Sequence, residues 1–244
     1  MPVNPIHPSS LLVHPFRVGA VAFDAVGTLI TPDPPVAVAY ETMGRRHGSR
    51  LSTDVIRGRF RAAFWAEEDC DRLAGWRTGP DREVGRWRRI VAAVLDDVAD
   101  QELCFRELWE HFSRPASWRC LPGVGAVLAE LARRGLAVGL ASNFDSRLRA
   151  VAAGLPELAP VRPVVVSAEV GWRKPAAEFF AALVRAFGCK PAEVLLVGDD
   201  FANDYVGATA AGVRAVLLDP AGRDRDKSHI GSLAELPDGG LLPN

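Results

Sequence analysis

The chain alternates short, wholly apolar runs with longer segments in which apolar residues recur at spacings of three and four. The short runs predict strands buried on both faces, at 21–23, 136–141, 163–167, 194–197 and 215–218. The longer segments that follow residue 120 predict helices at 124–134, 146–153, 176–187 and 202–211. Strands that alternate with helices of this length are typical of a parallel, doubly wound α/β sheet.

Between the first and second strands the pattern becomes helical throughout, after the proline-rich stretch TPDPPVAVAY. The spacing predicts helices at 36–47, 52–68, 82–99 and 101–113, and their balanced charges are interpreted as solvated helix faces. Domain limits follow from this change of pattern: an α/β core at 17–33 and 115–236, an all-helical cap at 34–114, and extended tails at 1–16 and 237–244. After the last strand, 221–244 is predicted to be a surface tail with a short helical segment at 232–236.

Composition narrows the class of protein. A net charge of −1 over 244 residues gives no basic excess, so nucleic acid and membrane surfaces are not expected partners. No apolar run is long enough to cross a bilayer, and the start of the chain lacks the charge pattern of a signal peptide, so a cytoplasmic protein is expected. The cysteines lack metal-ligand spacing and are predicted to be buried, reduced thiols. Oligomeric state is left open.

Polar residues follow the predicted strands where each strand ends. They are Asp24 with Thr28, Ser142 with Asn143, then Asp199, Asp200 and Asp204, with Lys174 in the loop after the third strand. Because parallel strands place their carboxyl ends along one rim, these side chains are expected to converge. Lys174 is one of only three lysines in the chain, which makes its place beside this rim more informative. Carboxylates suit Mg²⁺ and a lysine supplies a point charge for phosphate, so the sequence predicts a magnesium site beside a phosphate site.

Four segments carry a resemblance to a known family. FDAVGTL at 23–29, LASN at 140–143, RKP at 173–175 and VGDDFANDYVGA at 197–208 occur in the order and spacing of the haloacid dehalogenase superfamily of hydrolases. The chain resembles the phosphatase-like branch with a helical cap, over about residues 17–236. The resemblance implies a Rossmann-like core, Mg²⁺ as cofactor and a small, phosphorylated substrate.

The resemblance also implies catalytic and substrate-binding roles. Asp24 matches the nucleophile that forms an aspartyl-phosphate, and Lys174 matches the lysine that neutralises nucleophile and phosphoryl charge. Ser142 matches the phosphate-binding hydroxyl. The residues matched to substrate binding are Gly27, Thr28, Ser142 and Asn143.

The metal ligands implied by the resemblance are Asp24, the backbone carbonyl of Val26, Asp199 and Asp204. Within this set Asp199 matches the direct ligand, and Asp204 an outer acid that orients water held by the metal. Asp200 occupies a position often taken by serine and is expected only to brace the loop.

One position departs from the family pattern. Phosphatases of the family place a second aspartate two residues after the nucleophile, and Val26 stands there. Valine can neither protonate a leaving group nor activate water, and loss of such a group costs roughly 10²–10⁴ in rate. Three interpretations stay open: a phosphohydrolase whose leaving group needs no proton (acyl, enol or aryl phosphate), a 2-haloacid dehalogenase, or a binding protein with little turnover.

In the cap, the sequence gives only general candidates for substrate contact. Arg45, Arg46, Trp76 and Arg77 could contact a substrate, and none stands out from a solvated helix face. The tryptophans of this region are interpreted as core or lid-surface aromatics. They are Trp65, Trp76, Trp87 and Trp109.

Overall fold

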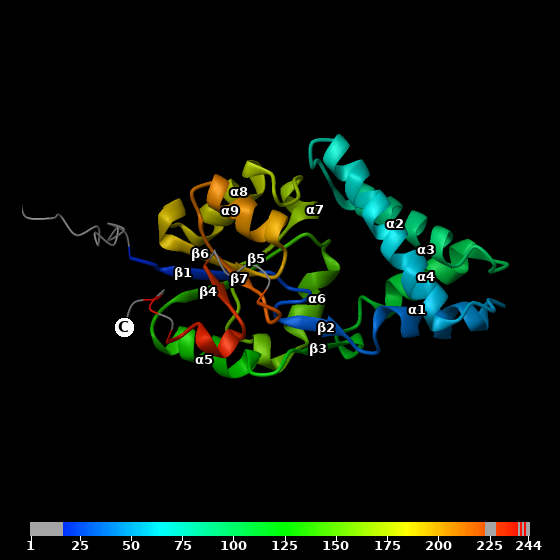
Figure 1. Cartoon of the computed structure of the whole chain (residues 1–244), viewed down its shortest axis with the longest axis horizontal. Helices are drawn as coiled ribbons and strands as arrows, with labels where there is room; N and C mark the ends of the chain where they lie inside the picture. The colour runs from blue at the N-terminus through cyan, green and yellow to red at the C-terminus, as the bar shows by residue number, and fades with distance from the viewer. Residues whose placement is uncertain (1–16, 223–227, 239, 241, 243–244) are drawn as a thin grey trace, which may run out of the picture.

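A computed structural model describes residues 17–222, 228–238, 240 and 242, and within them the main sheet is parallel (Figure 1). Its strands are β1 (Ala20–Phe23), β4 (Ala137–Ser142), β5 (Val164–Val166), β6 (Val194–Gly198), β7 (Arg214–Leu218) and β8 (His229–Ile230). They lie in the order β5-β4-β1-β6-β7-β8, and each neighbouring pair is parallel. After β1 the chain builds β4 and β5 on one side and then returns to the other side with β6, so the carboxyl end of β1 lies where the strand order reverses. Ligands bind at such a point in open α/β sheets.

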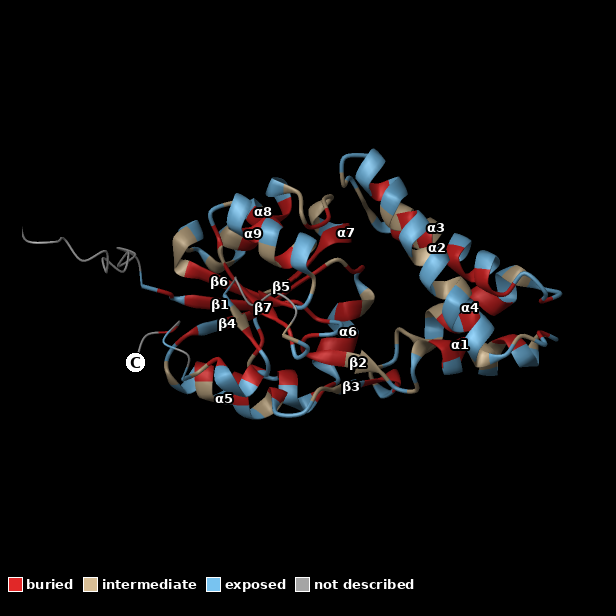
Figure 2. Cartoon of the chain, in the orientation of Figure 1, coloured by how far each residue is buried: buried red, intermediate tan, exposed pale blue. Residues whose placement is uncertain are grey.

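Helices cover both faces of this sheet (Figure 1). On one face lie α5 (Val124–Arg133) and α6 (Arg147–Ala153), and on the other lie α8 (Ala177–Phe187) and α9 (Gly207–Ala210). In β1, Val21 and Phe23 pack into the cluster that contains α5 and α6, whereas Ala20 and Ala22 join the cluster that contains α8. The strand is therefore buried on both sides, as its unbroken apolar run predicts (Figure 2).

A helical bundle is inserted between β2 (Ile30–Pro32) and β3 (Trp118–Cys120). It contains α1 (Val36–Arg46), α2 (Thr53–Leu73), α3 (Pro80–Val94) and α4 (Gln101–His111). The bundle has its own apolar core, which includes Tyr40, Ile56 and Ile90. It lies to one side of the sheet, beyond the carboxyl ends of the strands (Figure 1). The predicted doubly wound α/β fold with an all-helical insertion is therefore correct.

Some local expectations differ from the structure. The strands β2 and β3 pair antiparallel and connect the two parts of the molecule, but their three-residue lengths give no pattern that distinguishes them from loop. The segment after β7 is not a surface tail, because β8 joins the sheet and Ile230, Leu233 and Leu236 are buried in the main core. A helical turn at Leu233–Glu235 does match the short segment predicted there. The predicted tails, 1–16 and much of 237–244, lie outside the described residues.

Two smaller predictions also differ from the structure. The predicted helix at 202–211 consists of a π-helical turn at Phe201–Val206 followed by α9. Of the free cysteines, Cys104 is buried as expected, but Cys70 is exposed on α2.

Among the described residues, no helix has both the length and the apolar character needed to cross a membrane.

Candidate active site

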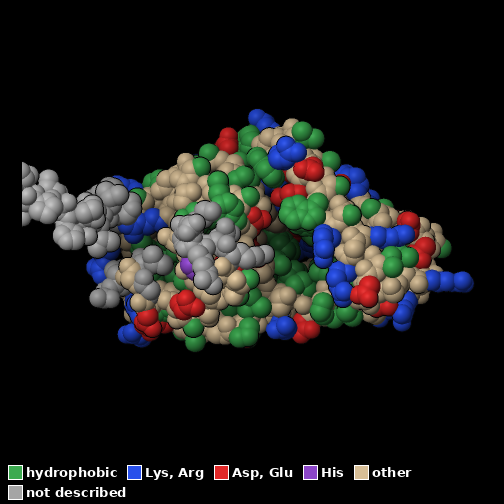
Figure 3. All heavy atoms as spheres, viewed as in Figure 1, with side chains coloured by type: hydrophobic (Ala, Val, Ile, Leu, Met, Phe, Trp, Pro, Cys, Tyr) green, Lys and Arg blue, Asp and Glu red, His purple; other side chains and the backbone are tan. Residues whose placement is uncertain are grey.

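The predicted site residues meet at the carboxyl ends of three adjacent strands. Asp24 follows β1, Ser142 ends β4, and Asp199 follows β6. They line a cavity of about 190 Å³ that α2 covers from the opposite side. In the space-filling view the surface is hollowed between the α/β body and the helical bundle (Figure 3). The expectation that these strand ends converge is therefore borne out by their geometry.

Lys174 is a buried cation of the site. Its Nζ donates hydrogen bonds to Asp24 Oδ1 at 2.7 Å, Asp204 Oδ1 at 2.5 Å and the carbonyl oxygen of Ala141 at 2.8 Å. Burial disfavours the charged form of an amine, but the carboxylates of Asp204 and Asp24 outweigh it and raise the pKa of Lys174 above its usual value. The charged form of the ammonium is therefore stabilised and held beside the predicted nucleophile.

Three carboxylates surround this single ammonium. Oxygen atoms of Asp24, Asp199 and Asp204 lie within 4.8 Å of one another. Partial loss of contact with water at Asp199, reinforced by the charge of Asp24, raises the pKa of Asp199 to about 6, and burial also raises the pKa of Asp204. Three carboxylates with one ammonium leave an excess of negative charge, and hard oxygen donors in this spacing suit Mg²⁺. The donor set therefore fits the divalent cation that the sequence predicts.

The turn after β1 brings its backbone against the carboxylate of Asp199. Gly27 has a φ of 94°, and a Cβ at this position would collide with Asp199 Oδ2. The hydroxyl of Thr28, which is buried, donates to Asp199 Oδ1 at 3.2 Å. Gly27 and Thr28 therefore orient the carboxylate of Asp199. Neither of these two predicted substrate-binding residues is among the described residues that line the cavity.

The loops after β4 and β6 are held by their own side chains. The Asn143 side chain accepts from the Lys174 N–H at 2.7 Å and donates to the Lys174 carbonyl oxygen at 2.9 Å, which fixes the backbone that carries the lysine. Asp200 accepts from the backbone N–H groups of Ala202 and Asn203, each at 2.9 Å. Asp200 therefore braces the loop, as the sequence predicts, and its carboxylate is engaged within the loop.

The helical bundle supplies residues that the sequence did not single out as a site. Phe64, Trp65 and Glu68 of α2 line the cavity above Asp24. The candidates Arg45, Arg46, Trp76 and Arg77 do not line it. No motif marks Phe64 or Glu68, because their position depends on how the bundle packs against the sheet. Only the abundance of aromatic residues in 60–65 could have suggested this surface.

Arg173, which also lines the cavity, ties the bundle to the loop that carries Lys174. Its guanidinium donates to Glu83 Oε1 at 2.6 Å and to Glu68 Oε2 at 3.4 Å, and its backbone N–H donates to the Trp76 carbonyl oxygen at 2.9 Å. A further backbone bond joins the Thr78 N–H to the Gly171 carbonyl oxygen at 3.0 Å. The position of the bundle is thus coupled to the loop next to the predicted catalytic lysine.

Arg173 belongs to a network of four arginines and four carboxylates joined by ion pairs. Its members are Arg82, Arg86, Arg89, Arg173, Glu67, Glu68, Asp71 and Glu83. Arg86, Asp71 and Glu83 are at most 2% exposed. The interpretation of the bundle's charges as solvated helix faces is therefore wrong for this cluster. The numbers of charged residues do not show that α2 and α3 place these side chains against each other.

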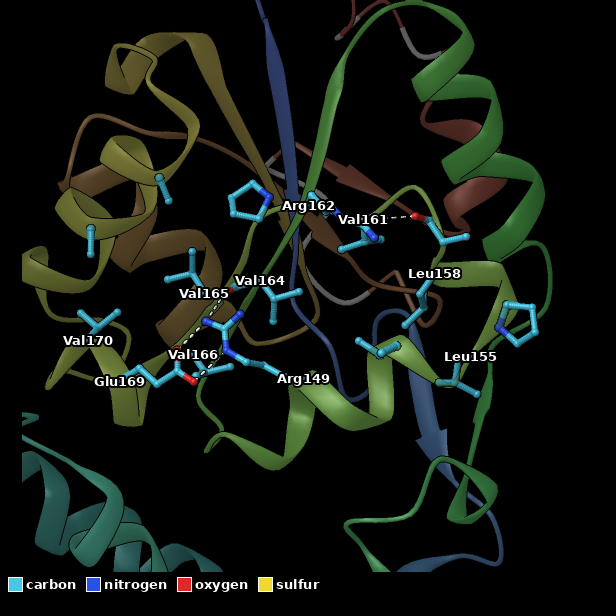
Figure 4. A pocket seen from close by; sticks show the side chains of 17 residues that line it. Arg149, Leu155, Leu158, Val161, Arg162, Val164, Val165, Val166, Glu169 and Val170 are labelled. Carbon is cyan, nitrogen blue, oxygen red and sulfur yellow. Dashed lines mark hydrogen bonds and ion pairs between the residues drawn. The ribbon is translucent and has the colours of Figure 1, made fainter.

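A second, wider hollow of about 850 Å³ lies away from these residues, around the edge strand β5 (Figure 4). Its lining is largely aliphatic, and Arg149 and Glu169 at its rim bond each other at 2.8 Å. None of the strand-end carboxylates lines it. The smaller cavity over Asp24 is therefore the candidate active site, because it holds the groups that can do chemistry.

Comparison with known proteins identifies the family of the chain. The model of the haloacid dehalogenase-like hydrolases matches residues 18–212. Haloacid dehalogenase-like hydrolase domain-containing protein 3 of Homo sapiens is 30% identical over 239 residues, covering 92% of this chain and 94% of its own length. Phosphoserine phosphatase of Thermus thermophilus is 31% identical, covering 87% and 95% respectively. Among solved structures, L-2-haloacid dehalogenase of Xanthobacter autotrophicus has a TM-score of 0.71 at 19% identity, covering 91% of this chain and 97% of its own, which is a likeness of fold. The chain belongs to the haloacid dehalogenase-like hydrolases.

Proposed function

We propose that this hydrolase is a Mg²⁺-dependent phosphohydrolase that acts on a small phosphorylated substrate through an aspartyl-phosphate on Asp24. The observation that carries the proposal is the grouping of Asp24, Asp199 and Asp204 around the Nζ of Lys174. A phosphatase among the relatives of similar length supports the substrate class.

In this proposal each residue acts at a stated atom. An Asp24 carboxylate oxygen attacks phosphorus, and the bond from phosphorus to the leaving oxygen breaks with its electron pair on that oxygen. Lys174 stabilises the charge that develops on the phosphoryl oxygens. The hydroxyl of Ser142, which lines the cavity, donates to a phosphoryl oxygen. Asp24, Asp199 and the Val26 carbonyl would hold Mg²⁺, with Asp204 as the outer acid of the set, and the cation would supply further charge neutralisation at the phosphoryl group.

Water then attacks the phosphorus of the aspartyl-phosphate, and Asp24 leaves as a free carboxylate with inorganic phosphate as the product. Val26 offers no proton donor or acceptor for either step. Substrates whose leaving group departs unprotonated are therefore favoured. Acetyl phosphate is the simplest of these, because acetate is a stable anion.

The test is hydrolysis of acetyl phosphate with and without Mg²⁺. We expect turnover that is abolished by chelation and by Asp24→Asn. Acid-quenched enzyme should carry covalent phosphate on the peptide that contains Asp24, detected by mass spectrometry. Absence of both turnover and the adduct in the presence of Mg²⁺ would overturn the proposal.

A second candidate is hydrolytic dehalogenation, and Val26 is the observation that favours it. A halide leaves as a stable anion and needs no proton. Against it, Asp199 and Asp204 add two carboxylates that displacement at carbon does not require. Metal-independent halide release from 2-chloropropionate would select this candidate over the phosphohydrolase.

A further inference from the structure

A second cavity, of about 210 Å³, adjoins the one above Asp24. The two cavities share three lining residues, Val26, Phe64 and Asn143. The second cavity lies where the helical bundle meets the β2–β3 pair and the loop after β4, and it is lined by Tyr40 from α1 and Trp118 from β3. We call it the aromatic chamber. Val26 therefore lies at the boundary between the chamber and the cavity above Asp24.

Aromatic rings form most of the chamber wall. Tyr40 and Phe60 meet edge to face with centroids 5.4 Å apart, and Phe60 lies 6.5 Å from Trp87. Phe112 bridges this group to Trp118 at 6.0 Å. Rings in contact over this range prefer to receive another ring, in edge-to-face or offset geometry.

The polar groups of the wall are occupied or neutral. Arg147 donates to both oxygens of Asp145, at 2.8 and 2.7 Å, and its guanidinium lies 3.5 Å from the centroid of Trp109. The Trp118 indole N–H donates to the Phe112 carbonyl oxygen at 3.1 Å. No carboxylate is among the described residues that line the chamber. Its free surface is therefore suited to an apolar ligand, since a charged one would lose water without gaining partners.

The volume of the chamber limits the size of the ligand group that it can hold. A dry apolar cavity of roughly 150 Å³ is enough to bind benzene. At about 210 Å³ the chamber accommodates one six-membered aromatic ring with small substituents.

Val26 connects the chamber to the chemistry. Val26 is 37% exposed and lines both cavities, so it lies at the boundary between them. A phenol ionises near pH 10, as tyrosine does, whereas bulk water ionises only near pH 15.7. A phenolate therefore departs without the acid that Val26 lacks.

We propose that the substrate is an aryl phosphate monoester whose ring occupies the aromatic chamber while its phosphoryl group lies against Asp24 and Lys174. This rests on the proposed function. The Asp24 carboxylate and the aryl phosphate dianion give the aspartyl-phosphate dianion and a phenolate, which takes its proton from solvent. Water then releases Asp24 carboxylate and dihydrogen phosphate.

The kinetic test compares phenyl phosphate, cyclohexyl phosphate and ethyl phosphate, with acetyl phosphate as a substrate too small to need the chamber. We expect kcat/KM for phenyl phosphate to exceed that for ethyl phosphate by at least about 10²-fold. Cyclohexyl phosphate separates the two contributions: its KM should approach that of phenyl phosphate, because the ring fits, while its kcat stays low, because an alkoxide leaves poorly. Equal kcat/KM for phenyl and ethyl phosphate would overturn the inference.

A matched pair of variants on α1 tests the chamber itself. Val36 lines the chamber, whereas Val38 is 37% exposed and does not line it. Val36→Phe should lower the ratio of kcat/KM for phenyl over acetyl phosphate at least about tenfold, and Val38→Phe should leave that ratio unchanged. Equal ratios in the two variants would contradict the chamber even if phosphatase activity is confirmed.

A binding measurement keeps the inference testable if acetyl phosphate is not hydrolysed and the proposed function fails. In Asp24→Asn protein, phenyl phosphate should bind at least about tenfold more tightly than inorganic phosphate, with a change in tryptophan fluorescence because Trp87 and Trp118 line the chamber. Adding Val36→Phe should remove this advantage. Equal affinities for the two ligands would refute the chamber as an aryl site.

Discussion

Two charge clusters lie side by side along residues 173 and 174, and they are balanced differently. Around Lys174, three carboxylates face one ammonium. Around Arg173, four carboxylates are paired with four arginines. One cluster has an excess of negative charge and the other has none.

The pKa values reflect burial in both clusters: in the balanced cluster, burial raises the pKa of Asp71 and lowers that of Arg86. Burial and mutual repulsion raise the pKa of Asp199 and of Asp204 in the unbalanced cluster. In the balanced cluster, burial opposes the charge on Arg173, but Glu83, Glu68 and Asp71 outweigh it and raise the pKa of this guanidinium. Equal numbers of opposite charges are typical of a structural ion-pair network, whereas an uncompensated excess of carboxylates fits the cation site proposed above. Variants that change one cluster at a time can break or sharpen this contrast.

The largest effect is expected from Lys174→Met, which removes the ammonium from the unbalanced cluster. Turnover of acetyl phosphate should fall by at least about 10³-fold, because charge on the phosphoryl group loses its fixed partner. Without Mg²⁺ the variant should also unfold at lower urea, since three carboxylates are left close together. Mg²⁺ should restore part of the stability and little of the turnover, measured by urea titration and steady-state kinetics. Near-normal turnover would contradict the role given to Lys174.

Arg173→Met tests the balanced cluster. Removal of one partner from a buried ion pair costs about 3–5 kcal/mol, because the remaining charge is left without compensation. The free energy of unfolding should fall by about this amount, and KM should rise because the bundle is less firmly held over the cavity. Arg89→Met is the matched control: its side chain is 56% exposed on the same network, so the loss should stay below about 1 kcal/mol. Equal losses in the two variants would refute the structural role of Arg173.

The contrast also explains what the sequence could predict. Asp24, Ser142, Lys174 and Asp199 could be placed together because each follows a recognisable buried strand or its loop, and parallel strands share one rim. The fold follows from the same alternation of apolar runs and helical spacing.

The balanced cluster and the aromatic chamber depend on packing between elements that are distant in the sequence, so no local sequence pattern predicts them. Glu83 and Arg173 are ninety residues apart and meet only when α3 lies against the loop after β5. The chamber likewise brings together Tyr40 of the bundle and Trp118 of the β2–β3 pair, and these two strands are too short to be recognised from the sequence. The domain limits at 33/34 and 114/115 stay predictions. The helices of the inserted bundle begin at Val36 and end at His111, within these limits.

Val26→Asp adds an acid to the cluster that already has an excess of carboxylates. If only a proton donor is missing, turnover of ethyl phosphate should rise by about 10²-fold, within the range of general acid catalysis. Phenyl phosphate should gain less, because phenolate does not need the proton. Val26→Asn has a similar shape without the acid and should give no gain, which a parallel kinetic assay of the two variants will establish. An equal gain in both variants would indicate a steric cause.

The smallest effect separates two neighbouring carboxylates that differ in environment. Asp199 belongs to the unbalanced cluster, whereas Asp200 accepts the N–H groups of Ala202 and Asn203 and so caps the turn at Phe201–Val206. Asp200→Ala should lower the free energy of unfolding by about 1 kcal/mol through loss of this cap. Asp200→Asn keeps an acceptor oxygen and should lose less, with the stabilisation by Mg²⁺ retained. Asp199→Asn removes the same charge one residue earlier, and it should abolish that stabilisation, which otherwise reaches about 2.7 kcal/mol at a Mg²⁺ concentration one hundred times its Kd. Urea titrations with and without Mg²⁺ decide between them: if Asp200→Asn loses the response to Mg²⁺ and Asp199→Asn keeps it, the assignment of the cation site to the unbalanced cluster is wrong.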